Sequence, residues 1–233
     1  MGKNNALKFV FIHGAGGTKN KWRSIIPVLG ENENICLDLP SHGENKAEQC
    51  ETIEDYANVL SASLTEDCIV VGHSMGGLVA LELGARSDKV KGIVLAASSY
   101  KLPVHPNIIA TLREGTFPDF LFRASYAKGA SQDLLEEEEQ ELDNSPTDVA
   151  MKDFQACDNY KIGKETLKQL QKPILAVIGD EDRLIPPNTE EELKALNPHV
   201  QVAKIEGAGH YIALEKPEEF VNHILQFRKV LEE

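Results

Sequence analysis

Short apolar runs alternate along the chain with longer stretches in which apolar residues recur every three or four positions. Six runs have the length and composition of buried strands, and they span residues 8–12, 34–38, 68–72, 92–97, 173–179 and 200–206. Helical spacing between and after them predicts helices over residues 21–29, 52–64, 75–85, 188–196 and 217–231. Because parallel strands need such crossovers, the alternation predicts an α/β fold with a mostly parallel sheet and helices on both faces.

One long interval interrupts this alternation. Residues 99–171 contain no strand-like run, and an irregular loop of that length is uncommon inside a compact domain. We therefore expect a small helical cap, inserted into a core formed by residues 1–98 and 172–233, and one domain overall. The acidic block at residues 136–139 is interpreted as a solvated helix face. Most of the interval's aromatic residues are assigned to the cap's own core, with one or two facing a substrate pocket: Phe117, Phe120, Phe122, Tyr126 and Phe154.

Composition and charge exclude several classes of function. The 233 residues are 42% hydrophobic and 26% charged, and no apolar run approaches the ~18 residues that a membrane span needs. The net charge of −13 repels nucleic acid and anionic membranes, so we expect neither as a partner. Four cysteines without a CxxC pair predict neither a disulfide nor a metal site. Residues 1–6 lack the apolar stretch of a secretory signal, so a cytoplasmic protein is expected.

The most informative segment is GHSMGG, residues 72–77. It follows a buried apolar run and precedes a helical pattern, so Ser74 lies on a strand-to-helix turn. A serine hydroxyl that projects from such a turn needs small neighbours because the backbone passes close by, and Gly72 and Gly76 supply that room. We predict that Ser74 is a nucleophile. The backbone N–H of Met75, at the start of the following helix, is the first candidate donor to an oxyanion.

A second glycine-rich segment, HGAGG at residues 13–17, ends the first apolar run. Taken alone, it is equally well explained as a turn that requires glycine. If it lies beside Ser74, it supplies a second oxyanion donor, for which we choose the backbone N–H of Ala15.

A serine nucleophile needs a base within hydrogen-bond reach, and that base needs an acid to orient it. Among seven histidines, His210 is the strongest candidate because its segment GAGHY follows the last strand and should share the strand-end edge with Ser74. His13 and His73 lie inside the glycine motifs, and we assign them packing and loop hydrogen bonds. The other four are interpreted as surface or structural residues: His42, His105, His199 and His223.

The candidate acid lies in GDEDRLIP, residues 179–186, which leaves another strand at the same edge. Chemistry alone leaves both Asp180 and Asp182 open. The run that follows the preceding strand, residues 97–99, offers no carboxylate. The residues therefore predict a triad of Ser74, His210 and one of these two aspartates.

Together these segments resemble the α/β-hydrolase superfamily over nearly all of the chain except the cap. The segments that carry the resemblance are HGAGG at 13–17, DLPSHG at 38–43, GHSMGG at 72–77, GDEDRLIP at 179–186 and GAGHYIALEKPEEF at 207–220. The order Ser, Asp, His also agrees. In this family the acid is usually the third residue after the strand-end glycine, so the resemblance selects Asp182 over Asp180.

Two features depart from the family pattern. The family usually has two strands before the one that leads to the HG motif, but only about seven residues precede it here. We therefore expect a sheet of about six parallel strands, whose exposed edge would offer a surface for self-association as a homo-oligomer. In the DLPSHG loop, Ser41 stands where the family typically has a glycine before the His-Gly pair.

The resemblance implies a serine hydrolase of the carboxylesterase kind, which cleaves a carboxylic ester of a small molecule through an acyl-enzyme on Ser74, without a cofactor. A thioester or a lactone would use the same residues. One alternative is a lyase like the menaquinone-pathway synthase, whose acidic substrate needs arginines; Arg86, Arg113 and Arg123 are available, but none lies in a motif that places it at the site. The other alternative is a non-catalytic, ligand-binding member of the fold.

Overall fold

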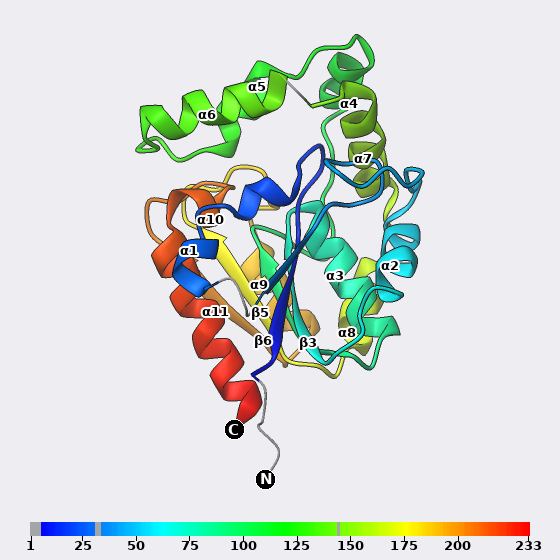
Figure 1. The fold of residues 1–233 in the computed structure, drawn as a ribbon, viewed down its shortest axis with the longest axis vertical. Helices are drawn as coiled ribbons and strands as arrows, with labels where there is room; N and C mark the ends of the chain where they lie inside the picture. The colour runs from blue at the N-terminus through cyan, green and yellow to red at the C-terminus, as the bar shows by residue number, and fades with distance from the viewer. Residues whose placement is uncertain (1–5, 31–33, 144) are drawn as a thin grey trace.

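The computed structural model describes residues 6–30, 34–143 and 145–233, and its centre is one sheet of six parallel strands (Figure 1). The strand order is β2-β1-β3-β4-β5-β6. The strands are β1 (Lys8–Ile12), β2 (Asn34–Leu37), β3 (Cys68–His73), β4 (Val90–Ala96), β5 (Ile174–Gly179) and β6 (Val200–Ile205). Each lies within two residues of the predicted run, because buried strands have continuous apolar sequences.

The helices of the core lie where the spacing predicts them, with two exceptions, one of which is the short helix α10 (Ile212–Glu215), which the spacing does not predict. The predicted helix over residues 21–29 is divided into a 3₁₀ helix, η1 (Lys19–Trp22), and a short helix, α1 (Ile26–Leu29). Pro27 lies at the start of α1 and lacks the N–H that a continuous helix would need there. The other core helices are α2 (Ile53–Ser61), α3 (Met75–Arg86), α9 (Thr189–Leu196), α10 (Ile212–Glu215) and α11 (Pro217–Glu232).

Helices cover both faces of the sheet, because successive residues of a strand point to opposite faces. Val10 and Ile12 of β1 pack into the hydrophobic cluster that includes α2, α3, α8 and α9. Phe9 and Phe11 pack into the opposite cluster, which includes η1, α1 and α11. The predicted α/β fold, with six parallel strands and helices on both faces, is therefore confirmed.

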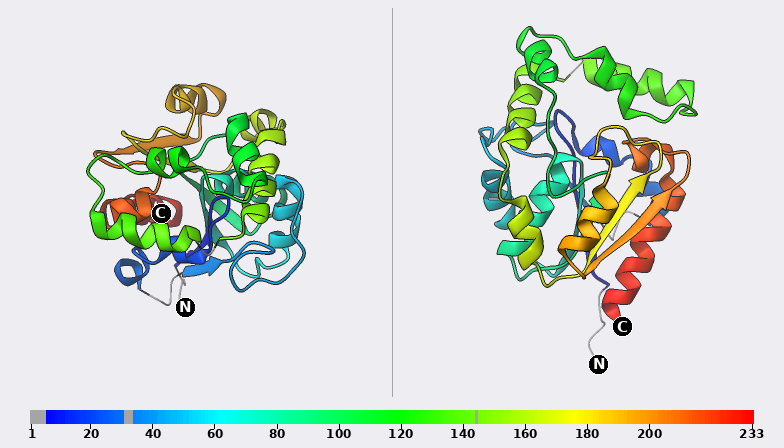
Figure 2. Two further views of the ribbon diagram at one scale, coloured as in Figure 1. Left: turned by 90° about the horizontal axis from the view of Figure 1, so that it is seen from above. Right: turned by 180° about the vertical axis from the view of Figure 1, so that it is seen from behind.

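The chain between β4 and β5 is helical, as predicted for the cap. Its helices are α4 (Pro106–Arg113), α5 (Asp119–Ser125), α6 (Gln132–Asp143), α7 (Thr147–Asn159) and α8 (Gly163–Gln169). Figures 1 and 2 show α4, α5 and α6 above the carboxyl ends of the strands, while α8 packs beside α3 in the core. The cap therefore covers the edge where the sequence motifs end.

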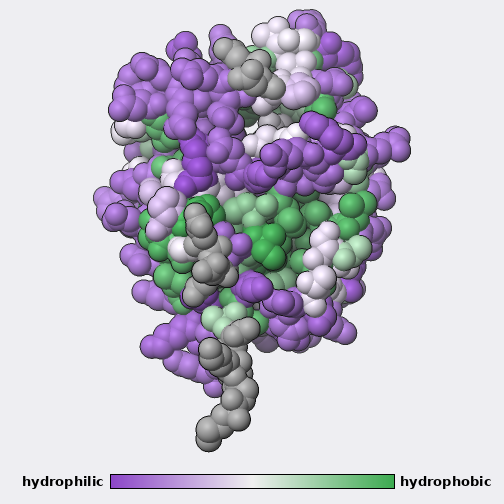
Figure 3. Space-filling view, in the orientation of Figure 1, coloured by the Kyte–Doolittle hydropathy of each residue, from purple (hydrophilic) through white to green (hydrophobic). Residues whose placement is uncertain are grey.

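Strand β2 forms one edge of the sheet and pairs with β1 on its inner side. Ile35 on this strand is 45% exposed, and Figure 3 shows apolar side chains at the middle of the face that this edge presents. Self-association through the edge stays a prediction. Within the part of the chain that the structure describes, no helix has the length and apolarity to cross a membrane.

Candidate active site

Ser74 lies on a sharp turn between β3 and α3. Its backbone is in the left-handed region, with φ 51° and ψ −119°, a conformation that costs a non-glycine residue roughly 1–3 kcal/mol. A Cβ on Gly72 would overlap the Gly76 carbonyl, and a Cβ on Gly76 would overlap the Ile12 carbonyl, so both positions require glycine. The turn leaves the Ser74 side chain at the wall of a cavity of about 360 Å³.

The structure brings His210 and Asp182 together at this cavity. His210 lines the cavity with Ser74, and its Nδ1 lies 2.9 Å from Asp182 Oδ2. With Nδ1–H donating to the carboxylate, Nε2 is left as an acceptor. Burial raises the pKa of Asp182, but the charge and hydrogen bond of His210 and the N–H groups of Leu184 and Ile185 outweigh it, so the pKa is lowered and the carboxylate stays ionised.

Asp180, the other candidate acid, faces a different partner. Its Oδ1 accepts a hydrogen bond of 2.7 Å from the Gly207 N–H, at the start of the loop that carries His210. The choice between the two aspartates therefore follows the resemblance: Asp182 contacts the histidine, and Asp180 supports its loop.

Both predicted oxyanion donors lie beside the nucleophile. Ala15 lines the cavity, and a Cβ on Gly14 would lie 3.1 Å from Ser74 Cβ, so this loop passes directly over the serine. Met75 is the first residue of α3 and is fully buried. The structure thus places Ala15, Ser74 and His210 at one cavity, and Met75 directly follows Ser74 at the start of α3.

His13 and His73 make loop hydrogen bonds, as predicted. His13 Nε2 accepts the Leu39 N–H at 3.0 Å, while Nδ1 donates to the Gly14 carbonyl at 2.8 Å. His73 Nε2 donates to the His210 carbonyl at 2.9 Å. Burial lowers the pKa of His13 to about 4 and that of His73 to about 3, so both rings are neutral near pH 7.

His42 is structural, as predicted, and it is also buried, with Nε2 2.7 Å from a carboxylate oxygen of Asp153 on α7. His199 is exposed and His223 is half-buried on α11, which agrees with their interpretation as surface or structural residues. His105 is different: it is exposed, caps α4 through the Asn107 N–H, and lines the cavity. Its position at the cavity is not visible from the sequence.

The cavity has a mostly apolar wall, to which the cap contributes. Three of the five aromatic residues considered for this role line it, rather than the one or two expected: Phe117, Phe120 and Phe154. The other two, Phe122 and Tyr126, contact each other, with ring centroids 5.1 Å apart and the rings tilted by 55°. Arg183 also lines the cavity and was missed, although it directly follows Asp182 in the GDEDRLIP motif.

A cap segment, residues 125–128, is bonded through its backbone to both loops of the Asp–His pair. The Ser125 carbonyl accepts the His210 N–H at 2.7 Å, and the Tyr126 carbonyl accepts a hydrogen bond from Arg183 at 2.8 Å. Glu215 joins the same parts, because its carboxylate accepts the Ala127 N–H at 2.8 Å and the Gly209 N–H at 3.1 Å. The cap therefore helps to form the loop that presents His210.

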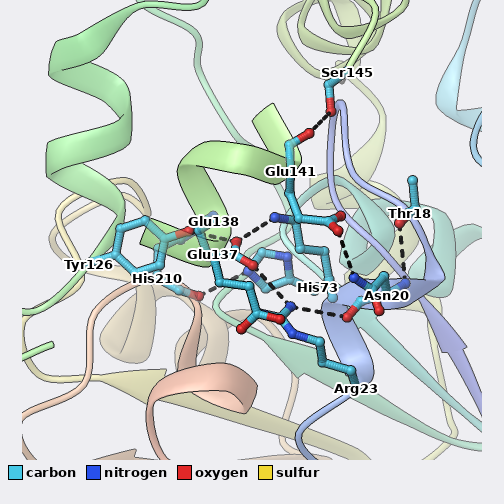
Figure 4. A network of polar contacts seen from close by, with 11 residues as sticks. Thr18, Asn20, Arg23, His73, Tyr126, Glu137, Glu138, Glu141, Ser145 and His210 are labelled. Carbon is cyan, nitrogen blue, oxygen red and sulfur yellow. Dashed lines mark hydrogen bonds and ion pairs between the residues drawn. The ribbon is translucent and has the colours of Figure 1, made fainter. Parts of the chain in front are cut away.

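The interpretation of the acidic block as a solvated face is wrong for one residue. Glu138 is fully buried, pairs with Lys21 and Arg23 of the η1 region, and accepts a hydrogen bond of 2.7 Å from Tyr126 (Figure 4). Burial raises its pKa, but the two cations and Tyr126 outweigh it, so the pKa is lowered. Glu136, Glu137 and Glu139 are exposed, as expected. This charged cluster fastens α6 to the core.

Comparisons with known proteins find relatives that match nearly the whole chain. A family model described as "Alpha/beta hydrolase family" matches residues 9–223. The uncharacterized hydrolase YugF of Bacillus subtilis (strain 168) is 27% identical over 244 residues, covering 94% of this chain and 89% of that protein. A pimeloyl-[acyl-carrier protein] methyl ester esterase of Neisseria meningitidis (serogroup C) is 28% identical over 235 residues, covering 93% and 91%.

Among solved structures, that of a thermophilic esterase superposes with a TM-score of 0.86 at 28% sequence identity, covering 98% of this chain and 91% of the other. In the described residues, no group of three or more His, Cys, Asp or Glu side chains could hold a metal ion. The family model spans all the motifs and the cap, and the solved structure shares the sheet and its helices. The chain therefore belongs to the alpha/beta hydrolase family.

Proposed function

We propose that this chain is a serine esterase that hydrolyses a carboxylic ester of a small molecule through an acyl-enzyme on Ser74. One observation carries the proposal: Ser74, on a strained turn, shares a cavity with His210, whose Nδ1 is held 2.9 Å from Asp182 Oδ2. A nucleophile, an oriented base and a buried acid in this order are the parts that acyl transfer needs.

In the proposed mechanism, Ser74 Oγ attacks the ester carbonyl while His210 Nε2 accepts its proton. The negative charge that forms on the carbonyl oxygen is stabilised by the backbone N–H groups of Met75 and Ala15. His210 then donates the proton to the leaving alcohol. A water molecule, deprotonated by His210, then attacks the acyl carbonyl, and His210 returns that proton to Ser74 Oγ as the carboxylic acid leaves. Asp182 stays ionised throughout and stabilises the imidazolium.

The apolar wall of the cavity favours a substrate whose acyl or alcohol group is apolar. Cap side chains, among them Phe117, Phe120 and Phe154, would contact that group. The names of two similar proteins, an acyl-carrier methyl ester esterase and a thermophilic esterase, also favour an ester over another acyl bond. A thioester or lactone would use the same residues.

The lyase alternative has less support from the site. Arg86 pairs with Glu82 within α3, while Arg113 and Arg123 are exposed on the cap and are absent from the cavity wall. Arg183 does line the cavity, but one of its guanidinium nitrogens donates to the carbonyls of Arg123 and Tyr126. That single cation lies beside a mostly apolar wall, which suits an ester better than a substrate with several carboxylates.

The test is the hydrolysis of p-nitrophenyl esters of graded acyl length by three proteins: the unaltered chain, Ser74→Ala, and Ser87→Ala as a matched control at the far end of α3. We expect the unaltered chain and Ser87→Ala to hydrolyse at least the shorter esters at equal rates. Ser74→Ala should lose roughly 10⁶-fold in kcat, the loss that removal of the nucleophile causes in a serine protease with the same kind of triad. Absence of turnover on every ester by the folded, unaltered chain would contradict the proposal.

A further inference from the structure

A buried carboxylate of the cap, Asp153 on α7, contacts the loop that carries the Ala15 N–H. Asp153 is fully buried, and its Oδ2 accepts the Gly16 N–H at 2.9 Å. Gly16 directly follows Ala15 and has a left-handed backbone, with φ 63°. A Cβ on Gly16 would lie 2.9 Å from Ala150 Cβ, also on α7, so the loop is in close contact with this cap helix.

Asp153 is held in place by donors from other segments. Tyr56 of α2 donates to Oδ1 at 2.7 Å, and Gln49 donates to the same oxygen at 3.3 Å. His42, from the DLPSHG loop, donates from Nε2 to Oδ2 at 2.7 Å. Four donors from separate segments leave the carboxylate one orientation, with Oδ2 toward Gly16.

The charge of Asp153 is balanced by His42. His42 Nδ1 lies 2.9 Å from the Pro40 carbonyl, so both ring nitrogens face acceptors and both carry protons. Burial lowers the pKa of His42, but the hydrogen bond and charge of Asp153 outweigh it, and the pKa is raised. His42 and Asp153 therefore form a buried ion pair, and the Gly16 N–H bonds to the carboxylate of that pair.

We infer that Asp153 is a positioning residue for the oxyanion loop: it fixes the Gly16 N–H, and thereby holds the adjacent Ala15 N–H beside Ser74. The inference rests on the proposed function of Ser74. An oxyanion donor acts only if it is in place before the charge forms, and a displacement of about 1 Å can cost roughly 10²-fold in rate. In this account the cap completes the catalytic site as well as covering it.

The experiment compares Asp153→Asn and Asp153→Ala with Asp148→Asn, an exposed position on the same helix. We measure kcat and KM on the best p-nitrophenyl ester, and the inhibition constant of a trifluoromethyl ketone, which forms a tetrahedral oxyanion adduct with a serine. Asparagine keeps an acceptor for Gly16 but loses the charge, so we expect kcat to fall about tenfold in Asp153→Asn and about 10²-fold in Asp153→Ala. Ketone binding should weaken by the same factors, with KM unchanged and Asp148→Asn unaffected.

Tyr56→Phe tests whether the orientation of Asp153 matters, because it removes one donor to the carboxylate without touching Gly16. It should lower kcat and ketone affinity, but by less than Asp153→Asn, because the other three donors still hold the carboxylate. Hydrogen exchange of residues 13–18 gives a readout apart from activity: exchange should quicken in both Asp153 variants and stay unchanged in Asp148→Asn.

The outcomes distinguish two failures. If the unaltered chain hydrolyses esters and binds the ketone, but both Asp153 variants keep its kcat, its ketone affinity and its exchange in residues 13–18, the inference is wrong and the proposed function stands. If a folded Asp153→Asn loses stability alone, the residue is merely structural and the inference is likewise wrong. If the unaltered chain neither hydrolyses esters nor binds the ketone, the proposed function fails and the inference with it.

Discussion

Two of the contacts between the cap and the core differ in kind. On the α7 side, one buried carboxylate, Asp153, bonds the oxyanion loop through the Gly16 N–H. On the other side, the backbone of residues 125–128 bonds the loops of His210 and Asp182 at several points, and Glu138 of α6 fastens the same half of the cap through Lys21 and Arg23.

This difference predicts different sensitivities to substitution. On the α7 side the loop depends on the charge of one side chain, so a single substitution there should act on catalysis. On the side of His210, the contacts are spread over several backbone groups, which a side-chain substitution leaves intact. A single substitution among these contacts should therefore lower the stability of the protein or lower kcat modestly, unless it removes the acid, Asp182. Four measurements examine this contrast, from the largest effect to the smallest.

Asp182→Asn should cause the largest loss of kcat among the substitutions on the side of His210. An asparagine amide would donate to His210 Nδ1, so the proton would move to Nε2 and the base could no longer accept from Ser74. We expect kcat to fall roughly 10⁴-fold with little change in KM. Asp180→Asn, which keeps an acceptor for the Gly207 N–H, is the matched control and should stay within twofold. Equal losses in both variants would show that the wrong aspartate has been assigned.

Glu138→Gln tests whether the α6 contact serves stability. The substitution leaves Lys21, which is 8% exposed, without its buried partner, and breaking a buried pair costs about 3 kcal/mol. Urea unfolding should show that loss of free energy, while kcat at a temperature where the protein is folded changes little. The control is Glu139→Gln, an exposed neighbour on α6. A kcat that falls as steeply as in Asp153→Ala would remove the contrast between the two sides.

Glu215→Gln weakens the link between the His210 loop and residues 125–128. The carboxylate accepts two N–H groups, from Gly209 and Ala127, and an amide has only one oxygen to offer them. Since other backbone bonds remain, we expect kcat to fall about tenfold, or about 1.4 kcal/mol. Glu218→Gln, exposed on α11, should have no effect. Unchanged kinetics in Glu215→Gln would show that the backbone bonds alone suffice.

The pH dependence of stability tests the two neutral histidines beside the glycine loops. The folded pKa values of His13 and His73, about 4 and about 3, lie below the unfolded value of 6.5. Their stabilising contribution is therefore complete above pH 6.5 and is lost as the pH falls toward the folded values. Between about pH 6.5 and pH 5, each should approach a slope of about 1.4 kcal/mol per pH unit in the free energy of unfolding.

His13→Gln tests how much of this pH dependence comes from His13. The variant should lose one of the two contributions, so its unfolding free energy should change less with pH over the same interval, whatever its absolute stability. Urea unfolding at several pH values measures both slopes. Identical slopes would mean that His13 is protonated in the folded protein, contrary to its bonds to Leu39 and Gly14.

Much of this arrangement could be predicted from the sequence, because it depends on local patterns. Buried strands have continuous apolar runs, and the glycines around Ser74 follow from close backbone approach that only glycine allows. Strand ends of a parallel sheet meet at one edge, which was enough to propose His210 and two aspartates. The choice of Asp182 needed the family resemblance, since nothing local separates it from Asp180.

The cap contacts could not be predicted, because they have no local pattern. Asp153 is one acid in an ordinary helix, and Gly16, which it contacts, is 137 residues away. Glu138 stands among four consecutive glutamates, and only its position opposite Lys21 distinguishes it. The bonds of residues 125–128 are made by backbone groups and leave no trace in side-chain chemistry. Arg183 alone had a signal, its place directly after Asp182 in a motif.

The most direct test of the central claim is covalent labelling with a fluorophosphonate, followed by intact mass measurement and peptide mapping. We predict one adduct per chain, on the peptide that contains Ser74, and none on Ser74→Ala under the same conditions. Loss of labelling should also follow pre-incubation with a trifluoromethyl ketone. An adduct on another residue, or labelling that survives in Ser74→Ala, would contradict the assignment of Ser74 as the nucleophile.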